Sequence, residues 1–304
     1  MDIRKLQVFC KVVELKSFTR TAEAVLLSQP TVSEHIRSLE QELGQKLINR
    51  LGREIEPTPV GRLLYGYGRR ILRLQQEALQ AVAEYSGTLA GRIMIGCGTI
   101  PGTYILPGLI GAFRTRYPSI KATLQITSSR TIAGKVMEGE LELGVVGARW
   151  NERSLVWNRV FADELNLAVH PDHPWADREA IALEELVGEP FILRESASGT
   201  RRVIAQILEQ HGLREAQLKE VAEIGSTAAV KEAVKAGLGV SILSRRALID
   251  DLDCGSIATV AVRGIRLERP FYLIRRKNRE LPPVAAVFLK FLLEEAEEAE
   301  ETEA

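Results

Sequence analysis

The sequence predicts an α/β protein with a small helical domain at its N-terminus and a long helix that joins this domain to the rest of the chain. Residues 1–57 carry apolar side chains at helical spacing and end in a glycine-containing hairpin pattern. Residues 60–85 follow a heptad pattern, and from residue 91 short apolar strands alternate with helical segments. We therefore expect three parts, at residues 1–58, 59–90 and 91–304.

Composition indicates a globular protein of a reducing compartment. With 304 residues, of which 45% are apolar, the chain is long enough for about two compact domains. Cys10, Cys97 and Cys254 are too scattered for a disulfide framework or a C-x-x-C metal site. The N-terminus has no apolar signal core, and no apolar run reaches the roughly 18 residues of a membrane span. We therefore expect a cytoplasmic protein without membrane contact.

Charge is balanced over the whole chain but not locally. Forty Lys and Arg residues match forty Asp and Glu residues. Between Lys46 and Arg73, seven basic residues are opposed only by Glu54 and Glu56. A local basic footprint of this kind suits the phosphates of nucleic acids. The last twelve residues hold seven Glu, which predicts a frayed and solvated tail.

Capping residues define three short helices in the first domain. Asp2 caps the first helix, Ser17 opens the second, and Ser28 with Pro30 starts the third, which stops at Gly44. A glycine-containing reversal at residues 51–53 then predicts a two-stranded wing. Small Ala22 lets the second and third helices approach, and the inner contact is expected from Leu26, Val32 and Ile36.

The long helix is predicted to pair with a second copy of itself. Thr58 and Pro59 provide a cap and a first-turn proline, and about 30 residues at about 1.5 Å each would extend about 45 Å. Packing of this helix on its own domain remains the alternative. The seam residues alternate steps of four and three: Val60, Leu64, Tyr67, Ile71, Leu74, Ala78, Ala81 and Tyr85.

The third part reads as α/β structure, and the segments between its strands have helical patterns. No internal repeat is present. The expected strands are residues 92–96, 121–126, 141–146, 164–169, 191–193 and 240–243.

The second and third helices have the pattern of a helix-turn-helix that binds DNA. In that motif the second helix enters the major groove and points its first turn toward base edges. Gln29, Thr31, Ser33 and Arg37 are expected to face outward, although a solvated helix face explains any one of them equally well.

Residues 1–91 resemble the DNA-binding module of LysR-type transcription regulators, and the resemblance continues to the end of the chain. Ile48 and the pair Glu56-Pro57 depart from the family pattern, which affects wing packing. The resemblance rests on residues 6–9 (LQVF), 17–22 (SFTRTA), 28–33 (SQPTVS), 36–40 (IRSLE), 43–44 (LG), 47–50 (LINR) and 58–61 (TPVG).

The resemblance implies a DNA-binding transcription regulator and not an enzyme, with no cofactor and with RNA polymerase as a further partner. It implies dimers that pair into tetramers, whereas the heptad pattern supports only the helix pairing. Overall the sequence looks most like regulators of sulfur or selenium metabolism. The DNA contacts carried over are Gln29, Pro30, Thr31, Ser33, Ile36 and Arg37, with Arg50 and Arg53 in the wing.

The resemblance further implies an effector domain like periplasmic solute-binding proteins. Subdomain I would comprise residues 91–164 and 266–304, and subdomain II residues 165–265. The two chain crossings are expected near residues 161–165 and 264–271. The effector would lie in the cleft between the subdomains.

Four hydroxyl-rich loops precede helices in the effector domain, where free amides and hydroxyls suit an anion. Helix capping is the alternative for each loop alone. A small oxyanion or carboxylate is therefore the expected effector. The candidate contacts are Thr99, Ser128 and Thr200, followed by Ser196, Ser198, Arg130, Ser226 and Thr227.

Three other interpretations remain open. Gly96 and Gly98 with Gly102 resemble a dinucleotide loop of an enzyme, but the third glycine comes one residue late. Cys97 beside an effector loop would suit a redox-sensing regulator, although a buried inert thiol is the simpler interpretation. His170 and His173 could be imagined as metal ligands, but their proline-rich setting favours a turn. A free-standing solute-binding protein is disfavoured by the first 91 residues.

Overall fold

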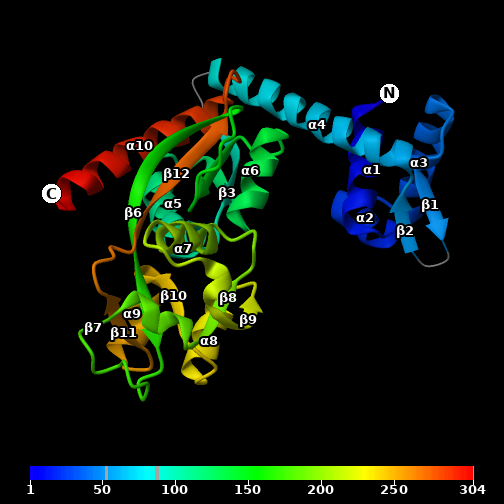
Figure 1. Cartoon of the computed structure of the whole chain (residues 1–304). Helices are drawn as coiled ribbons and strands as arrows, with labels where there is room; N and C mark the ends of the chain where they lie inside the picture. Colours follow the sequence, from blue (N-terminus) through cyan, green and yellow to red (C-terminus); the bar gives the residue numbers. More distant parts are fainter. Residues whose placement is uncertain (52–53, 86–88, 304) are drawn as a thin grey trace. The chain divides into compact units, whose positions relative to one another are not determined.

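The computed structural model describes residues 1–51, 54–85 and 89–303, and the chain divides into two compact units (Figure 1). The N-terminal unit comprises residues 1–88 and the C-terminal unit residues 89–304. Among the helices that the structure describes, none combines the length and hydropathy of a membrane span.

The N-terminal unit consists of three helices, a hairpin and a long helix, as the capping residues predict. The side chains of Asp2, Ser17 and Ser28 accept hydrogen bonds from the amides of the first turns. Gly44 ends the third helix with a φ of 64°, a left-handed conformation that favours glycine. The elements are α1 (Ile3–Leu15), α2 (Phe18–Val25), α3 (Gln29–Leu43), β1 (Ile48–Leu51), β2 (Glu54–Pro57) and α4 (Pro59–Tyr85).

Val32 and Ile36 of α3 lie in the apolar core of this unit, as predicted, but the prediction for Leu26 is wrong. Leu26 is the C-cap of α2 with a φ of 55°, and its side chain is 91% exposed. The left-handed backbone at this position turns the side chain out of the helix-helix contact. Leu27, the next residue, packs against the core instead.

The first turn of α4 is fixed to the segment that leads into the wing. The Thr58 hydroxyl donates to the Lys46 carbonyl at 2.7 Å and accepts from the Gly61 amide at 2.9 Å. The Thr58 amide donates to the Leu47 carbonyl at 2.9 Å. A Cβ on Gly61 would lie 2.0 Å from that same Leu47 oxygen, so only glycine fits at this crossing.

An eight-stranded mixed sheet organises the C-terminal unit, in the order β4-β3-β5-β12-β6-β11-β7 with β10 also paired to β6. A separate parallel pair joins β8 to β9. The strands are β3 (Gly91–Cys97), β4 (Ile120–Ile126), β5 (Leu143–Val146), β6 (Leu155–Val169), β7 (Ala180–Ile181), β8 (Pro190–Arg194), β9 (Lys219–Ile224), β10 (Ser241–Ser244), β11 (Ala258–Val262) and β12 (Glu268–Arg276).

Helices cover both faces of the sheet in this unit. At one end, α5 and α10 pack on one face and α6 on the other. At the other end, α7, α8 and α9 enclose a second group of apolar clusters. The helices are α5 (Leu106–Arg116), α6 (Ser129–Met137), α7 (Gly199–Gln210), α8 (Thr227–Lys235), α9 (Arg245–Asp253) and α10 (Pro283–Glu303), with short helical turns at Pro101–Ile105, Leu183–Val187 and Glu215–Gln217.

Long strand β6 links the two ends of the unit (Figure 1). Its first half pairs with β12, and its second half pairs with β10 and β11. The Leu165 amide donates to the Leu267 carbonyl at 2.7 Å where the two chain segments pass side by side. For the two ends of this unit we use the names subdomain I and subdomain II, with the bounds expected from the sequence.

The acidic end of the chain is helical and not frayed. Helix α10 continues to Glu303. Glu and Ala are both good helix formers, and no Gly or Pro interrupts the run after Pro283.

Candidate functional site

The first turn of α3 presents polar side chains to solvent. Gln29 and Pro30 are exposed, Thr31 and Ser33 are half-buried, and the Gln29 amide donates to the Ser33 hydroxyl at 3.1 Å. Arg37, one turn further, is exposed and makes no hydrogen bond or ion pair with the part of the chain that the structure describes. These five side chains can therefore approach another molecule.

Ile36 differs from the other expected DNA contacts. It is 1% exposed because it belongs to the core between α3 and its neighbours, so its side chain is not available to a base. Arg53 lies outside the described residues, and of Arg50 only the backbone, in β1, is described. The wing arginines therefore remain predictions.

A half-buried carboxylate fixes the wing to α3. Glu40 accepts hydrogen bonds from the Leu47 amide at 2.9 Å and from the Ile48 amide at 3.3 Å, and Lys46 donates to it at 2.8 Å. Burial disfavours the charged form of Glu40, but these three hydrogen bonds outweigh burial and lower its pKa. The groove between α3 and the wing therefore has a defined geometry.

Some residues of the predicted α4 seam are packed in the core, and others are exposed to solvent. Leu64 and Ile71 pack against the core of the N-terminal unit. Val60, Tyr67 and Leu74 are exposed, and so is Ala78. The side chains of Ala81 and Tyr85 lie outside the described part. Part of the heptad pattern is thus explained by packing within the unit, which the sequence left open.

In the C-terminal unit, the N-termini of α6 and α7 meet at one point between the subdomains. Ser128 caps α6 by accepting from the Thr131 amide, and Ser198 caps α7 by accepting from the Arg201 amide. A Cβ on Gly199 would lie 2.5 Å from the Ser129 hydroxyl, so the first residues of the two helices are in direct contact. The positive ends of two helix dipoles therefore converge here.

A buried ion pair lies beside this contact, on the two crossing strands. Arg269 of β12 donates from Nε to Asp163 of β6 at 2.8 Å and from Nη1 to the Thr200 hydroxyl at 2.8 Å. Asp163 also accepts from the Ser244 hydroxyl at 2.7 Å. All four groups are buried. Burial lowers the pKa of Arg269, whereas Asp163 opposes this shift, and the guanidinium remains charged.

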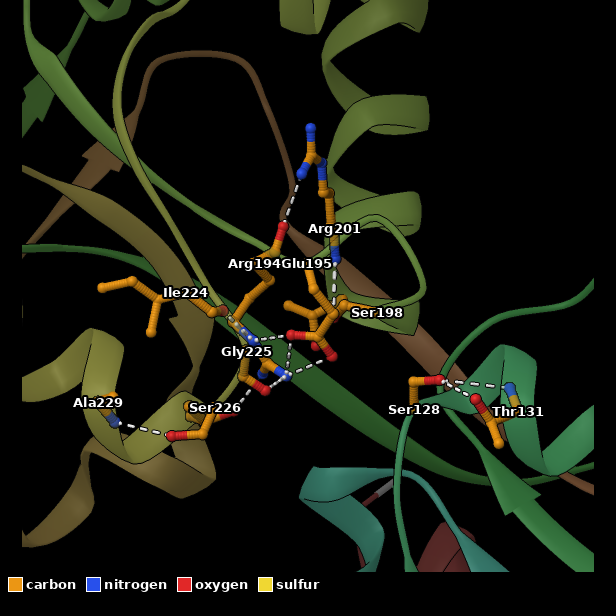
Figure 2. A network of polar contacts seen from close by, with 12 residues as sticks. Ser128, Thr131, Arg194, Glu195, Ser198, Arg201, Ile224, Gly225, Ser226 and Ala229 are labelled. Atoms are coloured by element: carbon orange, nitrogen blue, oxygen red, sulfur yellow. Dashed lines mark hydrogen bonds and ion pairs between the residues drawn. The ribbon is translucent and has the colours of Figure 1, made fainter. Parts of the chain in front are cut away.

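A second guanidinium, that of Arg194 at the end of β8, organises the loop before α8 (Figure 2). It donates to the Thr227 hydroxyl at 2.6 Å, to the Gly225 carbonyl at 3.1 Å and to the Ile224 carbonyl at 3.2 Å, and it pairs with Glu195 at 3.1 Å. Ser226 caps α8 by accepting from the Ala229 amide.

A narrow cavity of about 10 Å³ lies among these groups, which is of the order of one water molecule. A larger ligand must therefore separate the subdomains to enter. Of the predicted contacts, Thr99, Ser128, Ser198 and Thr200 line this cavity. Ser196, Arg130, Ser226 and Thr227 do not. The full lining is Gly98, Thr99, Ile100, Pro101, Ser128, Ser129, Gly147, Arg194, Glu195, Ser198, Gly199, Thr200, Arg269 and Phe271.

Sequence reasoning missed the charged members of this cavity. Arg269 lies within the crossing expected at residues 264–271, among several other arginines, so the sequence did not single it out. Arg194 follows the expected strand at residues 191–193, where strand ends place polar groups. Arg130 instead lies over the Trp150 ring at 5.9 Å, outside the cavity.

Two of the three glycines of the suspected dinucleotide loop, Gly96 and Gly98, have packing roles. A Cβ on Gly96 would lie 2.4 Å from Leu141, and one on Gly98 would lie 2.9 Å from the Ser129 hydroxyl. His170 and His173 form a turn after β6, in which their Nδ1 atoms accept from the amides of Asp172 and Trp175. The described residues contain no cluster that could hold a metal ion.

Cys97 is fully buried at the end of β3, and burial raises its pKa to about 12. Cys10 is buried as well, and burial followed by repulsion from Glu14 raises its pKa to about 12. The thiolate is the reactive form of cysteine, and it is scarce at neutral pH when the pKa is raised. The geometry therefore disfavours the redox-sensing interpretation.

A thiol-specific reagent at neutral pH is expected to label only Cys254 in the native protein. This residue is exposed, and its hydrogen bond to Ser256 lowers its pKa. Cys10 and Cys97 should react after denaturation, or in the folded chain only as pH rises toward about 12. A Cys254→Ser variant serves as the control and should remain unlabelled. Rapid labelling of native Cys97, measured by mass spectrometry, would restore the redox interpretation.

Two family models match the chain. The model described as "Bacterial regulatory helix-turn-helix protein, lysR family" covers residues 3–62, and the model described as "LysR substrate binding domain" covers residues 86–297. A "Probable RuBisCO transcriptional regulator" of Cyanidioschyzon merolae is 36% identical over 292 residues, which are 95% of this chain and 96% of that protein. A protein of the same name in Trichormus variabilis is 33% identical over 280 residues, which are 91% of this chain and 83% of that protein.

Solved structures share the fold. The regulatory domain of CcmR from Synechocystis, determined in complex with 2-PG, is 26% identical with a TM-score of 0.62 and covers 68% of this chain and 97% of that chain. Full-length CbnR complexed with its target DNA has a TM-score of 0.73 at 22% identity. The match covers 97% of this chain and 100% of that chain. The relatives are named for RuBisCO and not for sulfur or selenium. With both family models matched in chain order, this chain belongs to the LysR family of transcription regulators, which are not enzymes.

Proposed function

We propose that this protein regulates transcription by binding duplex DNA through α3 and the wing, under the control of a small anion that binds between subdomains I and II. The observation that carries the proposal is the convergence of the α6 and α7 N-termini on a cavity with two guanidinium groups.

The DNA-binding part is supported by the exposed first turn of α3, and Arg37→Ala tests it. We expect binding to weaken by about tenfold or more, because a charged contact to a base or phosphate is lost. A gel-shift titration at two salt concentrations measures the affinity and its salt slope. Arg266→Ala, at an exposed arginine of the C-terminal unit, is the matched control. An Arg37→Ala affinity equal to that of the control would contradict the assignment.

A dimer is the form that fits this DNA-binding mode. The exposed Val60, Tyr67 and Leu74 of α4 support pairing through this helix, and pairs of dimers would form a tetramer. Two symmetric modules would read an imperfect palindrome with half-site centres about 34–36 Å apart or a multiple of that. The relatives' names make a promoter of RuBisCO genes the first duplex to test. Such a regulator would act beside the chromosome, in the cytoplasm.

The effector is expected to carry a carboxylate or another oxyanion. Asp163 already neutralises Arg269 and Glu195 neutralises Arg194, so the helix N-termini provide the remaining positive potential. Two related domains support this chemistry, since CcmR was determined with 2-PG and the QuiR domain with shikimate, a carboxylate.

Calorimetry with sulfate, selenate, thiosulfate, simple carboxylates and 2-PG is expected to identify a ligand of the cavity. Thr99→Val should weaken its binding about tenfold, because one hydroxyl that lines the cavity is lost without a change of shape. Thr115→Val, on the exposed side of α5, should leave binding unchanged. If none of the anions releases or absorbs heat at a saturable site, the anionic effector must be abandoned.

Binding can control transcription only if the anion favours one arrangement of the subdomains over another. Because the cavity holds only about 10 Å³, entry of a larger ligand must move α7 relative to α6, with β6 and β12 as the hinge. Footprinting with and without the bound anion should show a changed protected length on the DNA.

A further inference from the structure

A second and larger cavity lies in the C-terminal unit, on the opposite face of β12 from the anion cavity, since Pro270 and Tyr272 line it whereas Arg269 and Phe271 line the anion cavity. Its volume is about 550 Å³, within the range of small-molecule sites, and its lining shares no residue with the first cavity. It is bounded by the loop after β5, by β6 and β12, and by Val203 and Gln206 of α7. The lining is Ala148, Arg149, Trp150, Asn151, Glu152, Arg153, Leu155, Trp157, Val203, Gln206, Pro270 and Tyr272.

Three aromatic rings form one wall of this cavity. Trp157 pairs with Ile274 across the two strands, so Trp157 and Tyr272 emerge on the same face of the sheet. Their ring centroids are 5.8 Å apart and nearly perpendicular, and Trp150 lies 6.4 Å from Trp157. Such a wall suits a flat ring, which gains both apolar burial and edge-to-face contact.

The rim of the cavity carries more basic than acidic side chains. Arg149 and Arg153 are exposed and make no hydrogen bond or ion pair with the residues that the structure describes. Arg153 also lines a neighbouring hollow of about 530 Å³ with Arg276 and Lys277. Glu152 is the acidic residue in the two linings. The unpartnered guanidinium groups are therefore available to an anion beside the aromatic wall.

Residues from both subdomains surround the cavity. Arg130 of α6 lies over the Trp150 ring at 5.9 Å, and Arg202 of α7 lies over it at 5.3 Å. Val203 and Gln206 of α7 complete the lining. An occupant would thus contact parts that come from both subdomains, and it would favour the arrangement in which these parts are close.

We propose that this cavity is a second small-molecule site, which takes a planar aromatic ring that carries a negatively charged group. The ring lies against Trp157 and Tyr272, and the charge lies at Arg149 and Arg153. The same chemistry occurs in aromatic carboxylates and in aromatic phosphates, including nucleotides. A second phosphate would extend toward Arg276 and Lys277.

The protein carries its own reporter for this site. Its three tryptophans are Trp150, Trp157 and Trp175, and only the first two line the cavity. In full-length protein with Trp175→Phe, fluorescence therefore comes from the cavity wall alone. We expect saturable quenching by benzoate, phenyl phosphate or AMP. Cyclohexanecarboxylate and inorganic phosphate, which have the charge without the planar ring, should quench at least about tenfold more weakly.

Arg149→Ala and Arg153→Ala, each made in the Trp175→Phe protein, should weaken the quenching ligand about tenfold. Both side chains are exposed, so the fold should be retained. Arg114→Ala, an exposed arginine of α5, is the matched control and should not alter binding. Tighter binding of benzoate would indicate that the site takes aromatic carboxylates. Tighter binding of phenyl phosphate or AMP would indicate that it takes phosphates attached to an aromatic group.

Three results would overturn the proposal. The first is no saturable quenching by any aromatic probe. The second is equal binding of cyclohexanecarboxylate and benzoate. The third is a response that Thr99→Val removes while Arg149→Ala and Arg153→Ala leave it intact, since this would place the probe in the anion cavity. Absence of an effector in the anion cavity leaves these readouts unaffected, so the two proposals fail separately.

Discussion

Arg269→Met is expected to destabilise the C-terminal unit by about 3–5 kcal/mol, because it removes the buried cation that pairs with Asp163 at 2.8 Å and leaves only the half-exposed Arg246, 3.8 Å away. Ser244 then remains the one hydrogen-bond donor shown for that carboxylate. Urea unfolding followed by tryptophan fluorescence measures this change, since all three tryptophans lie in the C-terminal unit.

The double variant Asp163→Asn with Arg269→Met distinguishes the stability lost with the ion pair from the stability lost with packing contacts of Arg269. Removing both charges should recover most of the lost stability, because a neutral amide costs far less to bury than an unpaired carboxylate. If the double variant is as unstable as Arg269→Met, the loss comes instead from the contact of the guanidinium group with the Phe271 ring, whose centroid lies 4.9 Å away. If the free energy of unfolding of Arg269→Met lies within about 1 kcal/mol of that of the parent protein, the ion pair is not buried away from water.

Gly61→Ala is expected to abolish DNA binding by unfolding the N-terminal unit or displacing α4. The added Cβ would lie 2.0 Å from the Leu47 carbonyl oxygen, which is held by the Thr58 amide and cannot move away. Overpacking against backbone should cost about 3 kcal/mol or more. Gel shift measures DNA binding, and circular dichroism measures the loss of helix.

Gly66→Ala is the matched control, five residues further along α4. No atom lies within 4 Å of a Cβ at Gly66, so alanine should stabilise the helix by about 0.5–1 kcal/mol. In both variants the tryptophan transition of the C-terminal unit should stay unchanged. Equal behaviour of Gly61→Ala and Gly66→Ala would contradict the proposed crossing of α4 and the segment before the wing.

Local signals in the sequence predicted the elements well. Caps such as Ser17 and Ser28 act on neighbours a few residues away, so the sequence alone identifies them. The left-handed Leu26 was mispredicted because its helical spacing matched the apolar face, whereas the helix ends one residue earlier. The heptad of α4 was ambiguous for a similar reason: Leu64 and Tyr67 follow one pattern, yet one packs inward and the other is exposed.

The candidate site was predicted only in part because its charged members meet across long sequence distances. Asp163 and Arg269 are 106 residues apart, and Arg194 and Thr227 are 33 apart. Nothing in the neighbourhood of either residue in the sequence indicates its partner. The hydroxyl loops were recognisable because each directly precedes a helix, a relation that is local.

The hydrogen bonds of Thr58 have a mechanical consequence for α4. Since Thr58 is bonded to Lys46, Leu47 and Gly61 together, the start of this helix cannot pivot on the groove-reading module. A change in the direction of α4 at its start would therefore move the segment before the wing with it. Small changes at this point would thus re-aim the module on its operator.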